Sequence, residues 1–219
     1  MIVQVTCERV FKPVHLGGLK AEEQSVMRSA EFDREYVLRS AMNEFIAKGY
    51  NKTSMQDLKR ATGLHPGSIY CAFENKRGLL LASLNHYAET KSKSFEEFFV
   101  DNDSILHGFE KYLNDIIEFK ECHENKGCLL QKSLSELEQQ DEEVEAIICG
   151  MLNQWKVNIR AKIEIAKTHG ELSSDTDCEL LGDFLVMNIY GLRSFATTKP
   201  SKECLEKLVK KIVQSIKNS

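Results

Sequence analysis

Apolar side chains recur at intervals of three and four residues along most of this chain, which is the period of an amphipathic α-helix. The chain also holds only three prolines, the residue that most strongly interrupts helices. The pattern therefore predicts an all-α protein. The expected helices span residues 31–48, a long segment from about 75, 103–122, a segment from 128, 141–168, 179–196 and 201–217.

Residues 53–76 predict two short helices joined by a tight turn. Thr53 and Gln56 fit a capping box that begins the first helix, and Gly63 offers the left-handed conformation that ends it. Pro66 suits the first turn of the second helix, because its missing N–H would have no partner there. Two short helices at a glycine-containing turn are typical of a DNA-binding helix-turn-helix.

The face of the second helix that lies opposite its apolar residues would point toward DNA. Gly67 allows close approach of the backbone, and the hydroxyls of Ser68 and Tyr70 are available to phosphates or base edges. The candidate DNA-binding residues are Thr53, Ser54, Pro66, Gly67, Ser68, Tyr70, Cys71 and Lys76.

Residues 31–84 resemble, without gaps, the N-terminal domain of the tetracycline-repressor (TetR) family of bacterial transcription regulators. Tyr70 and Lys76 stand where members of that family meet phosphates. Two positions depart from the commonest pattern: His65 replaces the Ser or Thr that usually caps the recognition helix, and Pro66 replaces a frequent lysine. The resemblance implies a homodimeric repressor that binds a palindromic double-stranded DNA operator and is released by a small-molecule effector or by cysteine modification.

Charge is divided unevenly along the chain, whose net charge is −4. Residues 27–77 hold nine Lys or Arg and six Asp or Glu, a net charge of +3, whereas residues 78–219 hold seventeen and twenty-four, a net charge of −7. A basic head on an acidic body suits a ligand-gated DNA binder, although chance variation along the chain gives a similar split. We therefore expect a helix-turn-helix domain at 27–77 and an effector-binding and dimerisation domain at 78–219.

The first 26 residues differ from the rest, because residues 2–11 alternate like a strand before Gly17 and Gly18. We expect residues 1–26 to be a flexible N-terminal extension, or a consequence of a start codon assigned upstream of the natural one.

The last two predicted helices carry more apolar surface than one packed face requires. In TetR-like proteins this pair meets its symmetry mate in a four-helix bundle, and a dimer would place two recognition helices about 34–36 Å apart. Packing within one chain is the alternative. The dimer-interface candidates are Leu181, Leu185, Asn188, Leu192, Leu205, Leu208, Val209, Ile212 and Ile216.

The body is expected to enclose a pocket for the effector among its central helices. Aromatic faces with polar tips suit a small organic ligand, and ordinary core packing is the alternative for each residue. The pocket candidates are Phe109, Tyr112, Trp155, Met187 and Tyr190.

Seven cysteines at irregular spacings, together with the lack of a signal-peptide pattern or membrane span, favour reduced thiols and a cytoplasmic protein. Cys122 lies among Lys120, His123 and Lys126, so a lowered thiol pKa and reaction with oxidants or electrophiles are one interpretation. Cys128 belongs to a Gly-Cys-Leu element that resembles a TetR branch with electrophile-sensing members. Packing is the alternative for both thiols, and their spacing matches no common zinc motif.

Two other classes of function remain open. An enzyme would need a Gly-rich phosphate loop, a nucleophile elbow or a His-Glu metal pair, none of which the sequence contains, so only thiol chemistry supports that class. A helical adaptor without DNA binding is the other alternative, because Pro66 stands where a basic residue is frequent. We expect no cofactor and no metal.

Overall fold

The structure, a computed structural model, describes residues 32–100, 104–118 and 128–219. Within these ranges every regular element is an α-helix, as the sequence predicted. The predicted extension at residues 1–26 lies outside the described residues. The helices are α1 (Arg34–Lys48), α2 (Met55–Thr62), α3 (Pro66–Phe73), α4 (Lys76–Glu97), α5 (Ile105–Ile117), α6 (Leu129–Leu137), α7 (Glu142–Thr168), α8 (Cys178–Ala196) and α9 (Lys202–Lys217).

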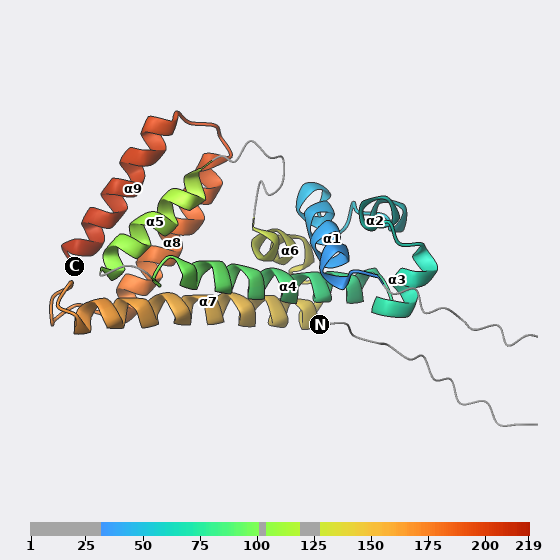
Figure 1. Cartoon of the computed structure of the whole chain (residues 1–219), viewed down its shortest axis with the longest axis horizontal. Coiled ribbons are helices and arrows are strands. Elements are labelled where there is room, and N and C mark those ends of the chain that lie inside the picture. Colours follow the sequence, from blue (N-terminus) through green and yellow to red (C-terminus); the bar gives the residue numbers. More distant parts are fainter. Residues whose placement is uncertain (1–31, 101–103, 119–127) are drawn as a thin grey trace, which may run out of the picture.

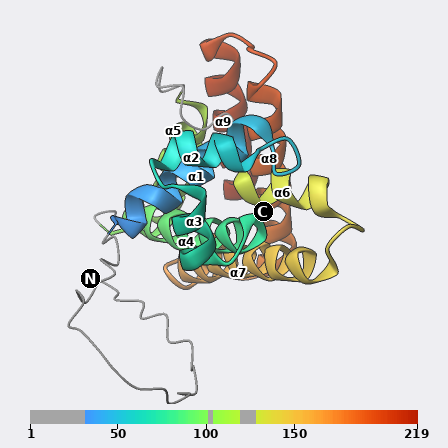
Figure 2. The same cartoon turned by 90° about the vertical axis from the view of Figure 1, so that its right-hand side faces the viewer.

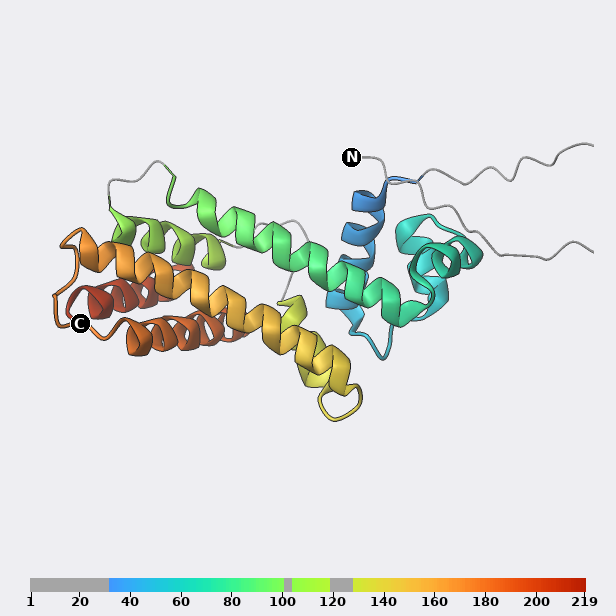
Figure 3. The same cartoon turned by 90° about the horizontal axis from the view of Figure 1, so that it is seen from below.

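Two long helices, α4 and α7, run side by side along the molecule and connect its two ends (Figures 1 and 3). The short helices α1, α2 and α3 gather at one end, which we call the head and which Figure 2 views from outside. Helices α5, α8 and α9 form the opposite end, which we call the body, and α6 lies between the two (Figure 1). This arrangement places the helix-turn-helix far from the C-terminal helices.

The head is built around the apolar stripe of α1. Val37, Ala41 and Phe45 are buried against the first half of α4, and Leu58 and Ile69 attach α2 and α3 to the same core. This core also includes residues of α6 and the beginning of α7, so it continues past the expected boundary at 77.

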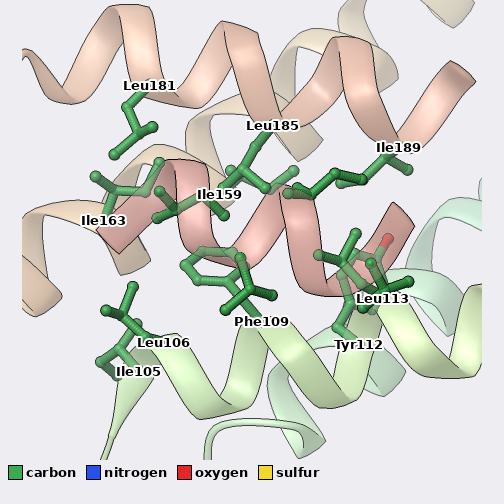
Figure 4. Packing of buried hydrophobic residues seen from close by; sticks show 14 of the residues in the cluster. Ile105, Leu106, Phe109, Tyr112, Leu113, Ile159, Ile163, Leu181, Leu185 and Ile189 are labelled. Carbon is green, nitrogen blue, oxygen red and sulfur yellow. The ribbon is translucent and has the colours of Figure 1, made fainter. Parts of the chain in front are cut away.

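The body core fills the space between α5, α7, α8 and α9. Phe109 is completely buried in its middle, with Ile159 and Leu185 close to it (Figure 4). The rings of Phe95 and Phe99 extend this core toward α4, with their centroids 4.9 Å apart. Burial of so many large side chains accounts for the strong apolar periodicity of the C-terminal half.

The fifth helix is shorter than the sequence predicted. The expected helix spanned 103–122, but α5 ends at Ile117, and Glu118 is already extended. Ser104 caps the beginning of α5, and its hydroxyl donates to Glu171 at 2.6 Å, so a contact with the end of α7 fixes that start. The periodicity of neighbouring residues could not predict this contact, because Ser104 and Glu171 are far apart in the sequence.

Polar contacts link the head to α6 and α7. Lys132 Nζ donates to the carbonyl of Ile46 at 2.6 Å, and the Asn51 N–H donates to Glu136 at 3.0 Å. Arg77, at the beginning of α4, donates to Asp141, the cap of α7. These contacts tie α6 and the beginning of α7 to the head.

Candidate nucleic-acid interface and effector site

The cap of α2 is formed one residue later than the sequence predicted. Ser54, not Thr53, is the N-cap, and its hydroxyl accepts from the Asp57 N–H at 3.1 Å while the Asp57 carboxylate accepts from the Ser54 N–H at 2.9 Å. Thr53 is only 1% exposed, and its hydroxyl donates to the carbonyl of Gly49 at 2.6 Å. The Thr53 side chain is therefore directed into the head, whereas Ser54 is exposed.

The turn between α2 and α3 has the predicted form. Gly63 ends α2 with φ of 72°, in the left-handed region that favours glycine. Thr62 supports the turn from inside, because its buried hydroxyl donates to Leu58 and accepts from the Leu64 N–H. The N–H groups of Gly63 and Leu64 in this tight connection thus both have partners within the motif.

His65 caps α3 in place of a hydroxyl. Its Nδ1 accepts from the N–H of Gly67 at 3.3 Å, and Pro66 occupies the first helical turn, as predicted. Both departures from the commonest family pattern therefore serve helix formation. The cap leaves the N-terminus of α3 at the outer end of the head.

The outward face of α3 is the candidate contact surface for DNA. Gly67 and Cys71 are exposed, and Tyr70 is 50% exposed although the ring is large and apolar. Ser68 and Pro66 are half-buried at the edge of this face. Ile69 and Phe73 anchor the opposite side of α3 in the head core.

The junction between α3 and α4 is held in one close geometry. Asn75 caps α4 through the Gly78 N–H, and a Cβ on Gly78 would lie 1.9 Å from the carbonyl oxygen of Phe73. Lys76 is half-buried with its Nζ 4.3 Å from the centre of the Tyr50 ring, and burial lowers the pKa of its ammonium group. The sequence pattern gave no signal for the role of Gly78.

Basic groups around the motif divide into structural and available ones. Lys48 is bound to Glu44 at 2.6 Å and to Asp57 at 2.7 Å, so its charge stabilises α1 and α2. Lys52 and Lys59 are exposed, and neither has an ion pair within the residues that the structure describes. These two ammonium groups are suited to phosphate contacts that position a protein on DNA.

Three of the five predicted pocket residues lie together in the structure, and the other two do not join them. Tyr112, Trp155 and Tyr190 lie together, with the indole and the Tyr190 ring 5.6 Å apart. Phe109 is a fully packed core residue. Met187 does not join this group, and its side chain is 62% exposed on the surface of α8.

Arg193 joins this aromatic group and was not singled out from the sequence. Its Nη2 donates to the Tyr112 hydroxyl at 3.3 Å, and its guanidinium lies 5.7 Å from the centre of the Trp155 indole. Burial alone would lower the pKa of Arg193, but the neighbouring Tyr112 and Tyr87 raise it, and the net direction is upward. Its only signal in the sequence is a cation four residues after Ile189, on an otherwise apolar face.

The two candidate redox residues have different outcomes. Cys122 lies outside the described residues. Cys128 is buried just before α6, beside Tyr87 in the head core. In the described segments no group of three or more His, Cys, Asp or Glu is placed to hold a metal ion. Among the helices there, none combines the length and apolar character needed to cross a bilayer.

Most of the predicted dimer-interface residues are used inside the chain. Leu181, Leu185, Leu205, Val209 and Ile216 are buried among α5, α7, α8 and α9, which is the packing within one chain that the sequence left as the alternative. The apolar stripes of α8 and α9 form the body core instead.

A shallow groove remains on the outer side of α8 and α9, with a volume of about 390 Å³. Asn188, Leu192 and Ile212 line it as predicted candidates, and Leu208 is 38% exposed at its edge. Met187 and Phe195 add exposed apolar surface to the same groove, and the sequence analysis did not assign either of them to an interface.

Comparisons with known families match both parts of the chain. Residues 37–83 match the model described as bacterial regulatory proteins of the tetR family, and residues 109–212 match the tetracyclin repressor-like C-terminal domain. The HTH-type transcriptional repressor ComR of Escherichia coli K12 is 26% identical over 183 residues, which cover 81% of this chain and 86% of ComR.

Solved structures give the same result. A cysteine mutant of the TetR family regulator CifR, complexed with 26-bp double-strand operator DNA, superposes with a TM-score of 0.76 at 26% identity, over 85% of this chain and 98% of that one. The reduced form of NemR from E. coli shares the fold with a TM-score of 0.71 at 19% identity, over 84% and 96%.

Proposed function

This chain belongs to the TetR family and is a DNA-binding transcriptional regulator, and we propose that it acts as a homodimeric repressor released from its operator by a ligand. The observation that carries the proposal is the outward face of α3. Gly67, Tyr70 and Cys71 are exposed on a helix whose other side is fixed in the head core. A rigid helix with one free face fits the major groove.

Dimerisation through the outer groove of α8 and α9 supports recognition of a palindrome. Met187, Phe195 and Leu208 are exposed there beside one another, and a symmetric contact would bury all three on each copy. A dimer holds its two recognition helices at a fixed separation, which must match successive major grooves about 34–36 Å apart.

Polar contacts between the head and helices α6 and α7 support release by a ligand. The ligand would bind more tightly to a dimer conformation in which the distance between the two heads does not match the operator. Helices α4, α6 and α7 would transmit this change from the body to the heads. Arg77 connects α4 to α7, and Lys132 connects α6 to α1. Through these polar contacts, a movement of α6 or α7 would change the position of α3.

The direct test is fluorescence anisotropy of the purified protein on labelled duplex taken from beside its own gene, with excess unspecific competitor at fixed salt. We expect specific binding of two protomers per duplex. Absence of specific binding to any duplex from that region would contradict the local repressor and favour a helical adaptor.

Thiol modification is a second mode of release, favoured by the position of Cys128 beside Tyr87. Because Cys71 is exposed on α3, its alkylation would block DNA directly. The experiment therefore uses Cys71→Ser as background. Loss of operator binding on alkylation that Cys128→Ser prevents would support sensing at Cys128, and unchanged binding would leave ligand binding as the only mode of release.

A further inference from the structure

Arg193 places a positive charge inside the body among uncharged groups. It lies in the last turn of α8 and is partly buried. Its neighbours include Tyr112 of α5 and Trp155 of α7. The negative end of the α8 dipole offsets part of its charge. A buried cation is otherwise expected to have an anionic partner.

The three tyrosines around Arg193 do not supply that anion at neutral pH. Burial raises the pKa of the Tyr112 phenol, and burial likewise raises the pKa values of Tyr87 and Tyr190, so all three stay protonated. In the parts of the chain that the structure describes, no carboxylate lies within ion-pair distance of Arg193.

The surroundings of Arg193 suit one kind of ligand. A guanidinium presents parallel N–H donors that match both oxygens of a carboxylate. The ring of Trp155 lies next to it and against the ring of Tyr190, and both rings are only partly buried. Tyr112 accepts from Arg193 and keeps its own hydroxyl proton for an anion.

We propose that the effector is a small organic carboxylate, held by Arg193 and the Tyr112 hydroxyl, with its hydrocarbon part against Trp155 and Tyr190. This inference rests on the proposed ligand-released repressor. It assigns the chemical class of the effector, and it explains why a cation occupies an apolar face of α8.

Trp155 is the only tryptophan of the chain, so its fluorescence reports binding at this place. The probes are acetate, hexanoate and benzoate, each compared with its neutral amide. We expect at least one carboxylate to change the fluorescence saturably, with a Kd about tenfold or more below that of its amide, the effect of one charge-assisted hydrogen bond.

Arg193→Met should abolish the preference for the carboxylate, whereas Arg193→Lys should keep part of it. The matched control is Arg160→Met, because Arg160 is an exposed arginine of α7 that pairs with Glu164 and Glu179. If Arg193→Met does not fold, Tyr112→Phe, which removes only the hydroxyl, should weaken the same preference. A preference that survives both substitutions, or no carboxylate bound better than its amide, would overturn the proposal.

Operator binding measured in the same samples separates this inference from the proposed function. Specific operator binding without any preference for a carboxylate contradicts only the effector class. A carboxylate preference at Trp155 without specific operator binding contradicts the repressor and leaves the anion site standing.

Discussion

Tyr70 is the exposed side chain with the largest surface on α3. Its ring is half exposed, while Ile69 next to it is completely buried. Leaving a large ring in water is useful on a surface that meets DNA, because the hydroxyl can donate to a phosphate and the ring can contact base edges.

We expect Tyr70→Ala to weaken operator binding by about tenfold, which corresponds to the loss of one hydrogen bond to a charged partner. The melting temperature of the variant should be unchanged, because the exposed ring contributes little to the packing of the head core. Anisotropy titrations and melting curves of Tyr70→Ala and Tyr70→Phe test this. Operator affinity equal to that of the wild type in Tyr70→Ala would remove Tyr70 from the interface.

Glycine is required at positions Gly63 and Gly78 for two different reasons. Gly63 has φ of 72° and open space around it, whereas Gly78 is crowded by the carbonyl of Phe73. Gly63→Ala is therefore expected to lower the free energy of unfolding by about 1 kcal/mol, the cost of the left-handed conformation. Gly78→Ala is expected to lower it by about 3 kcal/mol, because the backbone must move. Urea unfolding of the two variants tests the difference, and equal losses would contradict it.

The helices of the head begin and end through specific polar groups as well as through their apolar stripes. Ser54, His65 and Asn75 cap α2, α3 and α4 in succession. Each cap satisfies backbone N–H groups that the first turn leaves without partners. Three caps within 22 residues fix the angle at which α3 leaves the head.

Asp141 caps α7 and also binds Arg77 of α4. The hydrogen bonds from Arg77 and from the Val144 N–H lower the pKa of this carboxyl from 3.8 to about 2. A carboxyl with a lowered pKa in the folded state adds stability that is complete above pH 3.8 and is lost as the pH falls toward 2. The joint between α4 and α7 therefore weakens in acid.

We expect the unfolding midpoint in urea to fall less steeply between pH 4 and pH 2 in Asp141→Asn than in the wild type. Asparagine keeps the cap but loses the pair with Arg77. Glu142→Gln is the matched control, since Glu142 is exposed in the same turn. The same slope in the wild type and in Asp141→Asn would show that this pair does not contribute.

The two long helices α4 and α7 separate the proposed DNA contact from the proposed dimer contact. The helix-turn-helix lies at one end and the groove of α8 and α9 at the other (Figure 1). In the proposed dimer, a small change in the angle between the two copies at the groove would therefore become a larger displacement at α3.

Met187→Glu is expected to convert the dimer into monomers, because two copies of the groove would bring carboxylates into an apolar contact. Operator affinity should fall by roughly a hundredfold, since each head then binds alone. Light scattering after size exclusion measures the mass. Val157→Glu, on an exposed part of α7 outside the groove, is the control and should remain dimeric. A dimer in Met187→Glu would move the interface elsewhere.

Local sequence was sufficient for the all-α fold, for the turn at Gly63 and for Pro66 in the first turn of α3, because helix periodicity, left-handed glycine and proline are properties of neighbouring residues. It placed the cap of α2 one residue early. Ser and Thr are equivalent caps in sequence, and only the buried bond from Thr53 to Gly49 distinguishes them.

Tertiary structure alone decided which apolar residues of α8 and α9 face inward and which face the groove. Leu185 and Met187 look alike in a hydrophobic pattern, but α5 and α7 cover the first and leave the second exposed. The same holds for Arg193, whose significance depends on Tyr112 and Trp155, residues 81 and 38 positions away in the chain. A one-dimensional pattern records which residues are apolar or charged, whereas their partners are set by how the helices pack.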